Sequence, residues 1–123
     1  DGEDVIIPRA ERAGDEGVDF DGPVLCMRKT GVVTALAMPI GTRLNLAGRF
    51  ELNANATIGL TLREEHGKQQ WQFSASRTTR IRLVVRDRRM TRASSSGMTL
   101  NHNENSIEMV IDQGESSLAI ECR

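Results

Sequence analysis

Aromatic residues are scarce in this chain of 123 residues, which has three Phe, one Trp and no Tyr. Proteins that bind single-stranded nucleic acids usually stack bases on exposed aromatic rings, so the scarcity argues against a site of that kind. No apolar run approaches the roughly 18 residues that a membrane-spanning helix requires, and we therefore expect a soluble domain. The chain has neither an initiator Met nor a signal-peptide pattern at its start, which predicts a mature or excised piece.

Sequence motifs of enzymes and cofactor sites are also missing. The chain has no glycine-rich phosphate loop, no G-x-S-x-G elbow and no H-E-x-x-H motif. Its two histidines, His66 and His102, fall in predicted turns or loops, where imidazoles are usually solvated. Two cysteines and two histidines at unrelated spacings do not form a zinc site. The sequence therefore predicts a chain that is not an enzyme by itself and that has no metal and no cofactor.

The two cysteines, Cys26 and Cys122, lie near opposite ends of the predicted domain, and both fall in predicted strands. The first and last strands of a sandwich often lie side by side, and a disulfide closing so long a loop would add on the order of 4 kcal/mol of stability. The alternative is two small buried thiols with no bond between them, and we favour it over the disulfide.

Charge is distributed unevenly, although the net charge is only −1. Residues 1–23 carry eight acidic groups and two arginines, whereas residues 24–123 carry 14 basic and nine acidic groups. We expect residues 1–23 to form an acidic arm that is partly loop and in which only Val5–Ile7 can add a strand. Residues 24–123 then form one domain, which is what a chain of this length accommodates.

Apolar and polar residues alternate along most of the chain after residue 23. A period of two indicates strands with one buried face, and no ten-residue window shows a helical period with caps. Turn-forming residues separate the strands at 65–68, 94–97, 101–105 and 112–115. The pattern predicts an all-β fold, an antiparallel β-sandwich of the concanavalin-like or jelly-roll-like type, in a single domain. The positions expected to face the core are Leu44, Leu46, Phe50, Leu52, Ile58, Leu60, Leu62, Trp71, Phe73, Ala75, Ile81, Leu83, Val85, Ile107, Met109, Ile111, Leu118, Ile120 and Cys122.

Arginine is concentrated in one part of the chain, which we name the arginine-rich segment. Alternate residues of a strand stand about 6.5–7 Å apart on one face, close to the spacing of successive phosphates, so arginines placed this way can follow a polyanion. The alternative is an outer sheet face on which the arginines pair with neighbouring acids and cover apolar surface with their stems, and we favour it. The segment comprises Arg77, Arg80, Arg82, Arg86, Arg88, Arg89 and Arg92.

Several blocks in the second half of the chain share the order of a known sandwich. Ser106–Glu115 reads S-I-E-M-V-I-D-Q-G-E, Ile58–Arg63 reads I-G-L-T-L-R, and Trp71–Phe73 and Arg82–Val85 lie between them. These blocks resemble the C-terminal β-sandwich of family 32 glycoside hydrolases, the invertases, levanases and inulinases. In that family a strand of the type S-V-E-V-F-V-N-D-G-E precedes the last strand. The resemblance covers residues 58–122.

The resemblance implies an appended module and not the catalytic one, because the family's N-D-P-N-G nucleophile motif is absent. Its implied role is to support a catalytic domain, to mediate dimerisation or to contact a fructan or another carbohydrate. A parent protein would then be a glycoside hydrolase, and a secreted one. Because related sandwiches contact sugars through arginine and carboxylate side chains, we select the sugar-binding residues by residue type. They are Arg86, Asp87, Glu64 and Trp71.

Two functions of other classes stay open beside this one. The first is a sandwich that binds a polyanion or nucleic acid through Arg80–Arg92, with an affinity that falls steeply as salt rises. The second is a structural subunit, of the kind that forms coats. The expected partners are a catalytic domain or identical subunits, a carbohydrate, no membrane, and nucleic acid only under the first alternative. The sequence does not indicate a compartment by itself.

Overall fold

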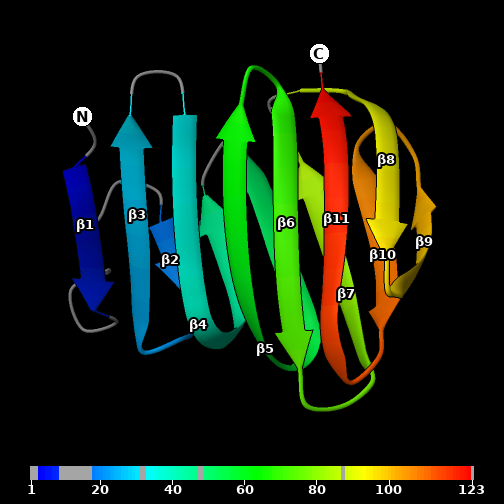
Figure 1. The fold of residues 1–123 in the computed structure, drawn as a ribbon, viewed down its shortest axis with the longest axis horizontal. Helices are drawn as coiled ribbons and strands as arrows, with labels where there is room; N and C mark the ends of the chain where they lie inside the picture. The colour runs from blue at the N-terminus through cyan, green and yellow to red at the C-terminus, as the bar shows by residue number, and fades with distance from the viewer. Residues whose placement is uncertain (1–2, 9–17, 31–32, 47–48, 87, 123) are drawn as a thin grey trace.

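The computed structural model describes residues 3–8, 18–30, 33–46, 49–86 and 88–122. Within these ranges the protein is all-β, with eleven strands and no helix (Figure 1). Every strand pairing is antiparallel, which confirms the predicted antiparallel β-sandwich in a single domain. The strands are β1 (Glu3–Pro8), β2 (Val18–Phe20), β3 (Val24–Thr30), β4 (Val33–Leu46), β5 (Phe50–Glu65), β6 (Lys68–Ala75), β7 (Thr79–Val85), β8 (Met90–Ser96), β9 (Met98–His102), β10 (Ser106–Ile111) and β11 (Gly114–Cys122).

Two layers of strands face each other across the core (Figure 1). The front layer has the order β1-β3-β4-β5-β6-β11-β8. The rear layer has the order β2-β4-β5-β7-β10-β9. Strands β4 and β5 belong to both layers because each is long and bends from one to the other. The two layers are therefore joined along one side of the sandwich by continuous strands.

The bend in β4 coincides with a break in its pairing with β5. The register shifts between Met38 and Gly41 and again between Gly41 and Arg43. Such irregularities let a strand turn sharply while most of its backbone stays paired. In β5, Phe50–Ala54 pair with β7 in the rear layer, and Ile58–Glu65 pair with β6 in the front layer. The same strand therefore supplies side chains to the outer faces of both layers.

The core lies between the layers and consists largely of the positions that the alternation predicted. All of those positions are buried except Ala75 and Cys122, which are partly buried and pack against the others. Trp71 is at its centre, with Phe50 edge-on at a centroid distance of 5.2 Å and Phe73 stacked at 5.9 Å. The pattern missed Phe20, Leu25, Leu36 and Met38, which β2, β3 and β4 contribute to the same core.

The turns agree with the sequence in most places. The β5–β6 hairpin turns at His66 and Gly67, both with positive φ (51° and 77°), as a tight hairpin requires. The prediction of a turn over Ser94–Gly97 is wrong for the serines, which form the end of β8 and pair with β11. Only Gly97, with a φ of 79°, makes that turn, because an L side chain rarely adopts this conformation.

Residues 1–23 contribute two strands to the sandwich. β1 contains Val5–Ile7, the segment that the sequence singled out, and pairs with β3 at the edge of the front layer. β2 is a three-residue strand that pairs with the end of β4 in the rear layer. Residues 21–23 connect β2 to β3, and the other parts of the proposed acidic arm, residues 1–2 and 9–17, lie outside the described residues.

The disulfide considered for Cys26 and Cys122 is not present in this fold. Cys26 is on β3 and Cys122 on β11, and β4, β5 and β6 lie between these strands in the front layer. Four strand spacings amount to about 19 Å, whereas the Cα atoms of a disulfide are less than about 7 Å apart. The first and last strands of this sandwich are not neighbours, so the premise of the disulfide was wrong.

Candidate functional site

A groove lined by both polar and apolar residues runs across the outer face of the rear layer. Its volume is about 490 Å³, and it crosses β5, β7, β10 and β9. A volume of this size is within the range of small-molecule sites. The side chains that face it alternate along the strands with Ala54, Ile81 and Met109, which point to the core or pack against it.

One row of polar side chains crosses the whole groove. Asn53 on β5 is paired with Arg82 on β7, Arg82 with Glu108 on β10, and Glu108 with Asn101 on β9. All four side chains are exposed. Directly opposite residues in an antiparallel sheet have their Cβ atoms about 4.5–5.5 Å apart, so the row presents two amides, a guanidinium and a carboxylate side by side. We name it the polar row.

A second row lies beside the polar row, closer to the bend of β5. Arg80 on β7 is paired with Val110 on β10, and Asn55 lies on β5. The backbone N–H of Arg80 donates to Oδ1 of Asn55 at 2.9 Å. The backbone pairing of β5 with β7 ends at Ala54 and Ile81, so the side chain of Asn55 accepts a hydrogen bond where the backbone ladder stops. The hydrogen bond fixes the amide of Asn55 at the groove wall.

The charges in the groove nearly balance. Arg80 and Arg82 are positive and Glu108 is negative, while Asn53, Asn55 and Asn101 add amide donors and acceptors. Half-buried Val110 adds an apolar surface between these groups. The arrangement suits a ligand with many hydroxyl groups and little charge. Of the four residues selected from the sequence, the three that the structure describes, Arg86, Glu64 and Trp71, are not among the residues that line this groove.

Two of the selected residues, Glu64 and Trp71, meet in the interior. Trp71 is fully buried and Glu64 is 6% exposed. Nε1–H of Trp71 donates to Oε1 of Gln69 at 3.0 Å, and Nε2–H of Gln69 donates to Oε2 of Glu64 at 2.8 Å. Oε1 of Glu64 accepts from Arg49, and Nη1 of Arg88 is 4.0 Å from Oε2. This buried chain of polar groups connects the two layers and leaves the ring of Trp71 no face toward a ligand.

The other two selected residues lie apart from that pair. Arg86 is exposed and forms an ion pair with Glu51 of β5. Glu51 pairs in register with Val84, one row away from Asn53 and Arg82, so Arg86 borders the groove at the end of β7. Asp87 lies outside the described residues. The selection by residue type therefore does not define one site.

The arginine-rich segment is divided between the two layers. Arg80 and Arg82 are on β7 in the rear layer, and Arg92 is on β8 in the front layer. Arg77 is exposed in the turn between β6 and β7. Four arginines have carboxylate partners: Arg86 with Glu51, Arg88 with Glu64, Arg89 with Glu104 at 3.7 Å, and Arg92 with Glu121 at 3.5 Å. Four of the seven arginines are thus paired with carboxylates, and the segment is distributed over both layers.

The described ranges contain no group of three or more His, Cys, Asp or Glu side chains arranged to hold a metal ion. Nor is there, within the same ranges, a helix of the length and apolarity needed to cross a membrane. Comparisons with protein-family models, curated proteins and solved structures found no match. The resemblance to family 32 glycoside hydrolases is tested by none of these findings and stays a prediction.

Proposed function

We propose that this chain is a non-catalytic β-sandwich module that binds a carbohydrate in the groove of the rear layer, as an accessory to a catalytic domain. The observation that supports this proposal best is the polar row from Asn53 through Arg82 and Glu108 to Asn101. The resemblance of residues 58–122 to the sandwich of β-fructosidases supports the same assignment and favours a fructan as the ligand.

The chemistry of the polar row matches that of vicinal hydroxyl groups. The guanidinium of Arg82 can donate two parallel hydrogen bonds, while Glu108 beside it accepts from sugar hydroxyls. Asn53 and Asn101 both donate and accept at the two ends of the row. These side chains stand on four paired strands, which hold them more firmly than loops would. The apolar surface of Val110 can contact the C–H groups of the sugar ring.

The same groups favour a neutral ligand over a polyanion. Of the charged residues that line the groove, two arginines are opposed by one carboxylate. A polyanion gains affinity mainly through released counterions, which requires many unopposed cations. Binding of a neutral sugar should therefore change little between low and high salt. With no aromatic ring among the groove residues, we expect a weak affinity, with a Kd on the order of 1 mM.

The experiment is a titration of the protein with levan, inulin and sucrose, and in parallel with heparin, at low and high salt. We expect salt-insensitive binding to one of the fructans. Arg82→Ala should weaken it at least tenfold, since a lost charge-assisted hydrogen bond costs roughly 1.5–3 kcal/mol and each 1.4 kcal/mol is about tenfold in affinity. Arg63→Ala is the matched control, because Arg63 is an exposed arginine on the opposite layer.

Three outcomes would contradict the proposal. In the first, only heparin binds, and its affinity falls steeply with salt. In the second, a fructan binds but Arg82→Ala and Arg63→Ala have equal effects, which places the site elsewhere. In the third, no carbohydrate binds at concentrations well above 1 mM, which is about the limit of a useful affinity.

A further inference from the structure

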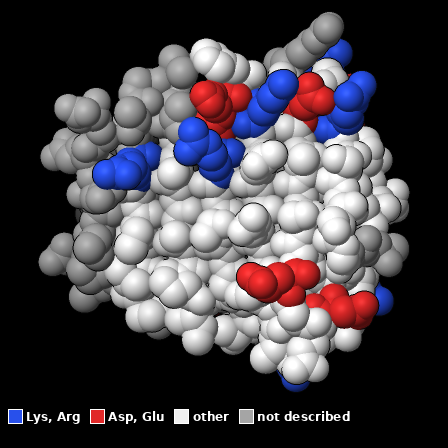
Figure 2. Space-filling view, in the orientation of Figure 1, with Lys and Arg blue, Asp and Glu red and all other residues white. Residues whose placement is uncertain are grey.

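The outer face of the front layer differs from that of the rear layer in having an uncharged middle. Charged side chains lie along its upper and lower margins, and the centre carries none (Figure 2). The residues opposite one another in register explain this appearance. One complete row across six strands has no charge, and we name it the uncharged row. It consists of Cys26, Ala37, Thr61, Gln72, Ser117 and Ser96.

The neighbouring row continues the same chemistry on most strands. Its four uncharged members are Ala35, Gln70, Ala119 and Ser94, and the other two are arginines, Arg28 on β3 and Arg63 on β5. Small side chains lose little rotamer freedom when they are covered. Because the uncharged row has no charged side chain, covering it does not require a charge to be desolvated. Both properties lower the cost of covering this face with another protein surface.

The outer face of the front layer is also self-complementary in shape, since it carries both a hollow and a ridge. A hollow of about 580 Å³ lies over Ala35, Ala37 and Thr61, because these side chains are short, and Arg28 and Arg63 are also among the residues that line it. Beside it on β6, Gln70 and Gln72 are exposed and line the hollow from one side. A smaller hollow of about 330 Å³ lies beyond them, over Ser94, Ser117 and their neighbours. Gln70 and Gln72 therefore form a ridge between two hollows.

A ridge and a hollow on one face are what a two-fold symmetric interface requires, since the same patch must serve both subunits. Six strands about 4.8 Å apart and about 24 Å long cover on the order of 600 Å² per copy. Two such faces bury roughly 1,200 Å², slightly above the ~1,000 Å² that separates specific interfaces from incidental contacts. The area therefore suffices for a weak dimer.

We propose that the front layer is the interface of a homodimer, in which Gln70 and Gln72 of one copy enter the hollow over Ala35 and Ala37 of the other. A two-fold axis in the plane of the interface brings the ridges and hollows together on both sides. The two front layers then form the inside of the dimer, and the grooves of the two rear layers face outward. This interface does not depend on whether the grooves bind a carbohydrate.

The test is the molar mass of the protein as a function of concentration, by sedimentation equilibrium. We expect the mass to rise from 13.6 kDa toward twice that value as the concentration approaches the millimolar range. Ala37→Arg fills the hollow with a charged side chain and should weaken the association at least tenfold. Gln72→Glu, which is less demanding for folding, puts two like charges into the interface and should weaken it in the same direction.

Val84→Arg is the matched control, because Val84 is half-buried on the outer face of the opposite layer. It should leave the mass unchanged while Ala37→Arg lowers it, and circular dichroism should show that all variants are folded. A wild-type mass of 13.6 kDa at every concentration would overturn the proposal. So would a dimer that Val84→Arg dissociates and that Ala37→Arg and Gln72→Glu leave intact. Failure of carbohydrate binding alone would leave it standing.

Discussion

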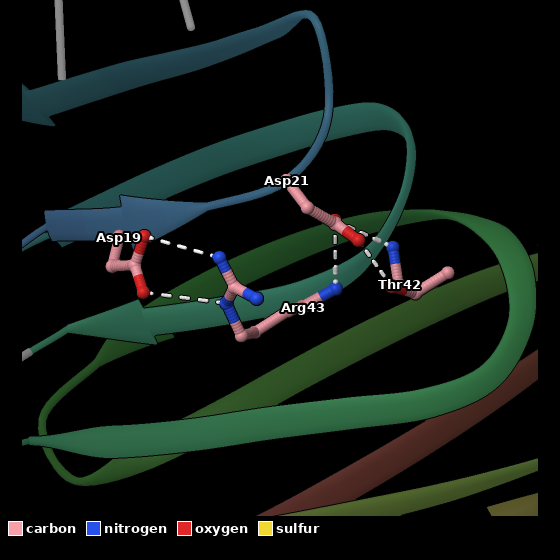
Figure 3. A network of polar contacts seen from close by, with 4 residues as sticks. All are labelled: Asp19, Asp21, Thr42 and Arg43. Carbon is pink, nitrogen blue, oxygen red and sulfur yellow. Dashed lines mark hydrogen bonds and ion pairs between the residues drawn. The ribbon is translucent and has the colours of Figure 1, made fainter.

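The carboxylate of Asp21 accepts a hydrogen bond from the backbone N–H of Thr42 at 2.7 Å (Figure 3). The same carboxylate accepts from the hydroxyl of Thr42 and from the backbone N–H of Arg43, the latter at 2.9 Å. Two residues earlier, Asp19 pairs with the guanidinium of Arg43 at 3.3 Å. Thr42 and Arg43 lie where β4 passes from the front to the rear layer. The connection between β2 and β3 therefore holds the bend that joins the two layers.

Glycine at position 22 allows this connection to run close to the bend. A Cβ atom there would lie 2.1 Å from the backbone oxygen of Ile40, far inside any van der Waals contact. The chain can pass at this distance only without a side chain. Asp21 is thereby brought within hydrogen-bond reach of the β4 backbone.

We expect Asp21→Ala to destabilise the protein by roughly 2–3 kcal/mol, because it leaves two backbone N–H groups of β4 without their acceptor. Urea denaturation at neutral pH measures this difference. Asp112→Asn is a suitable control, since Asp112 is exposed in the β10–β11 turn. Equal stability of Asp21→Ala and the wild type would show that the bend does not depend on this carboxylate.

Stability should also depend on pH through Asp21. Burial alone raises the pKa of this carboxyl, but hydrogen bonds from Thr42 and Arg43 and the charge of Arg43 outweigh it and hold the pKa below 3.8. A carboxyl whose pKa is lower in the folded than in the unfolded state stabilises the fold above the unfolded value. That contribution is lost as the pH falls from about 3.8 through the folded pKa.

The measurement is the free energy of unfolding of the wild type and of Asp21→Asn, at a series of pH values from neutral to strongly acidic. The advantage of the wild type should be constant at neutral pH and should shrink once the pH falls below about 3.8. An advantage that persists unchanged at the acidic end would contradict the lowered pKa. Because asparagine cannot ionise, the comparison isolates this one group from the other carboxyls.

In the buried chain from Trp71 to Glu64, Gln69 links the indole of the tryptophan to the carboxylate. Gln69→Ala leaves the indole N–H without its acceptor and removes the amide donor of Oε2 of Glu64, in a region where Gln69 itself is 3% exposed. We expect a loss of about 2–4 kcal/mol, because both stranded groups are buried. Emission of Trp71, the single tryptophan, reports the opening of this region during urea unfolding.

Gln70→Ala is the control for this substitution, since Gln70 is the next residue on the same strand and is exposed. At the low concentrations used in fluorescence it should leave the free energy of unfolding within about 0.5 kcal/mol of the wild type. If Gln69→Ala were equally mild, the buried polar chain would contribute nothing to stability.

The sequence predicts the burial of individual side chains better than it predicts the order of the strands. The alternation of apolar and polar residues predicts which side chains are buried, because successive side chains of a strand point to opposite faces of the sheet. Applied strictly, it also places Glu64 inside, on the same face as Leu60 and Leu62. We selected Glu64 as a sugar-binding residue by its type alone, without regard to the face of the strand on which it lies. Carboxylates are rarely buried, and Glu64 is an exception. Its partners Gln69 and Arg49 explain the exception.

Alternation does not predict which strands are neighbours. Asn53, Arg82 and Glu108 lie far apart in the sequence, and each occupies an ordinary outward position of its strand. Only the order β5-β7-β10-β9 brings them into one row. Because the strand order was not known from the sequence, we considered a disulfide between Cys26 on β3 and Cys122 on β11, which three other strands separate. Strand order arises from long-range pairing, which local patterns do not record.

The pairing of the arginines makes a prediction about polyanions. Arg89 and Arg92 lie beside Glu104 and Glu121, so their charges are partly cancelled in place. Replacing both carboxylates by glutamine frees the two arginines and raises the net charge by two. The double variant Asp112→Asn, Glu115→Gln changes the net charge equally at exposed positions for which the structure records no ion pair.

Heparin-affinity chromatography distinguishes local pairing from net charge. We expect Glu104→Gln, Glu121→Gln to elute at clearly higher salt than the wild type, and the control double variant to move much less. The reason is that affinity for a polyanion follows the number of unopposed cations it meets, and less so the total charge. Equal shifts for the two double variants would mean that these exposed ion pairs are too weak to mask the arginines. The polyanion alternative would then regain support, because the arginines would act as free cations in the wild type.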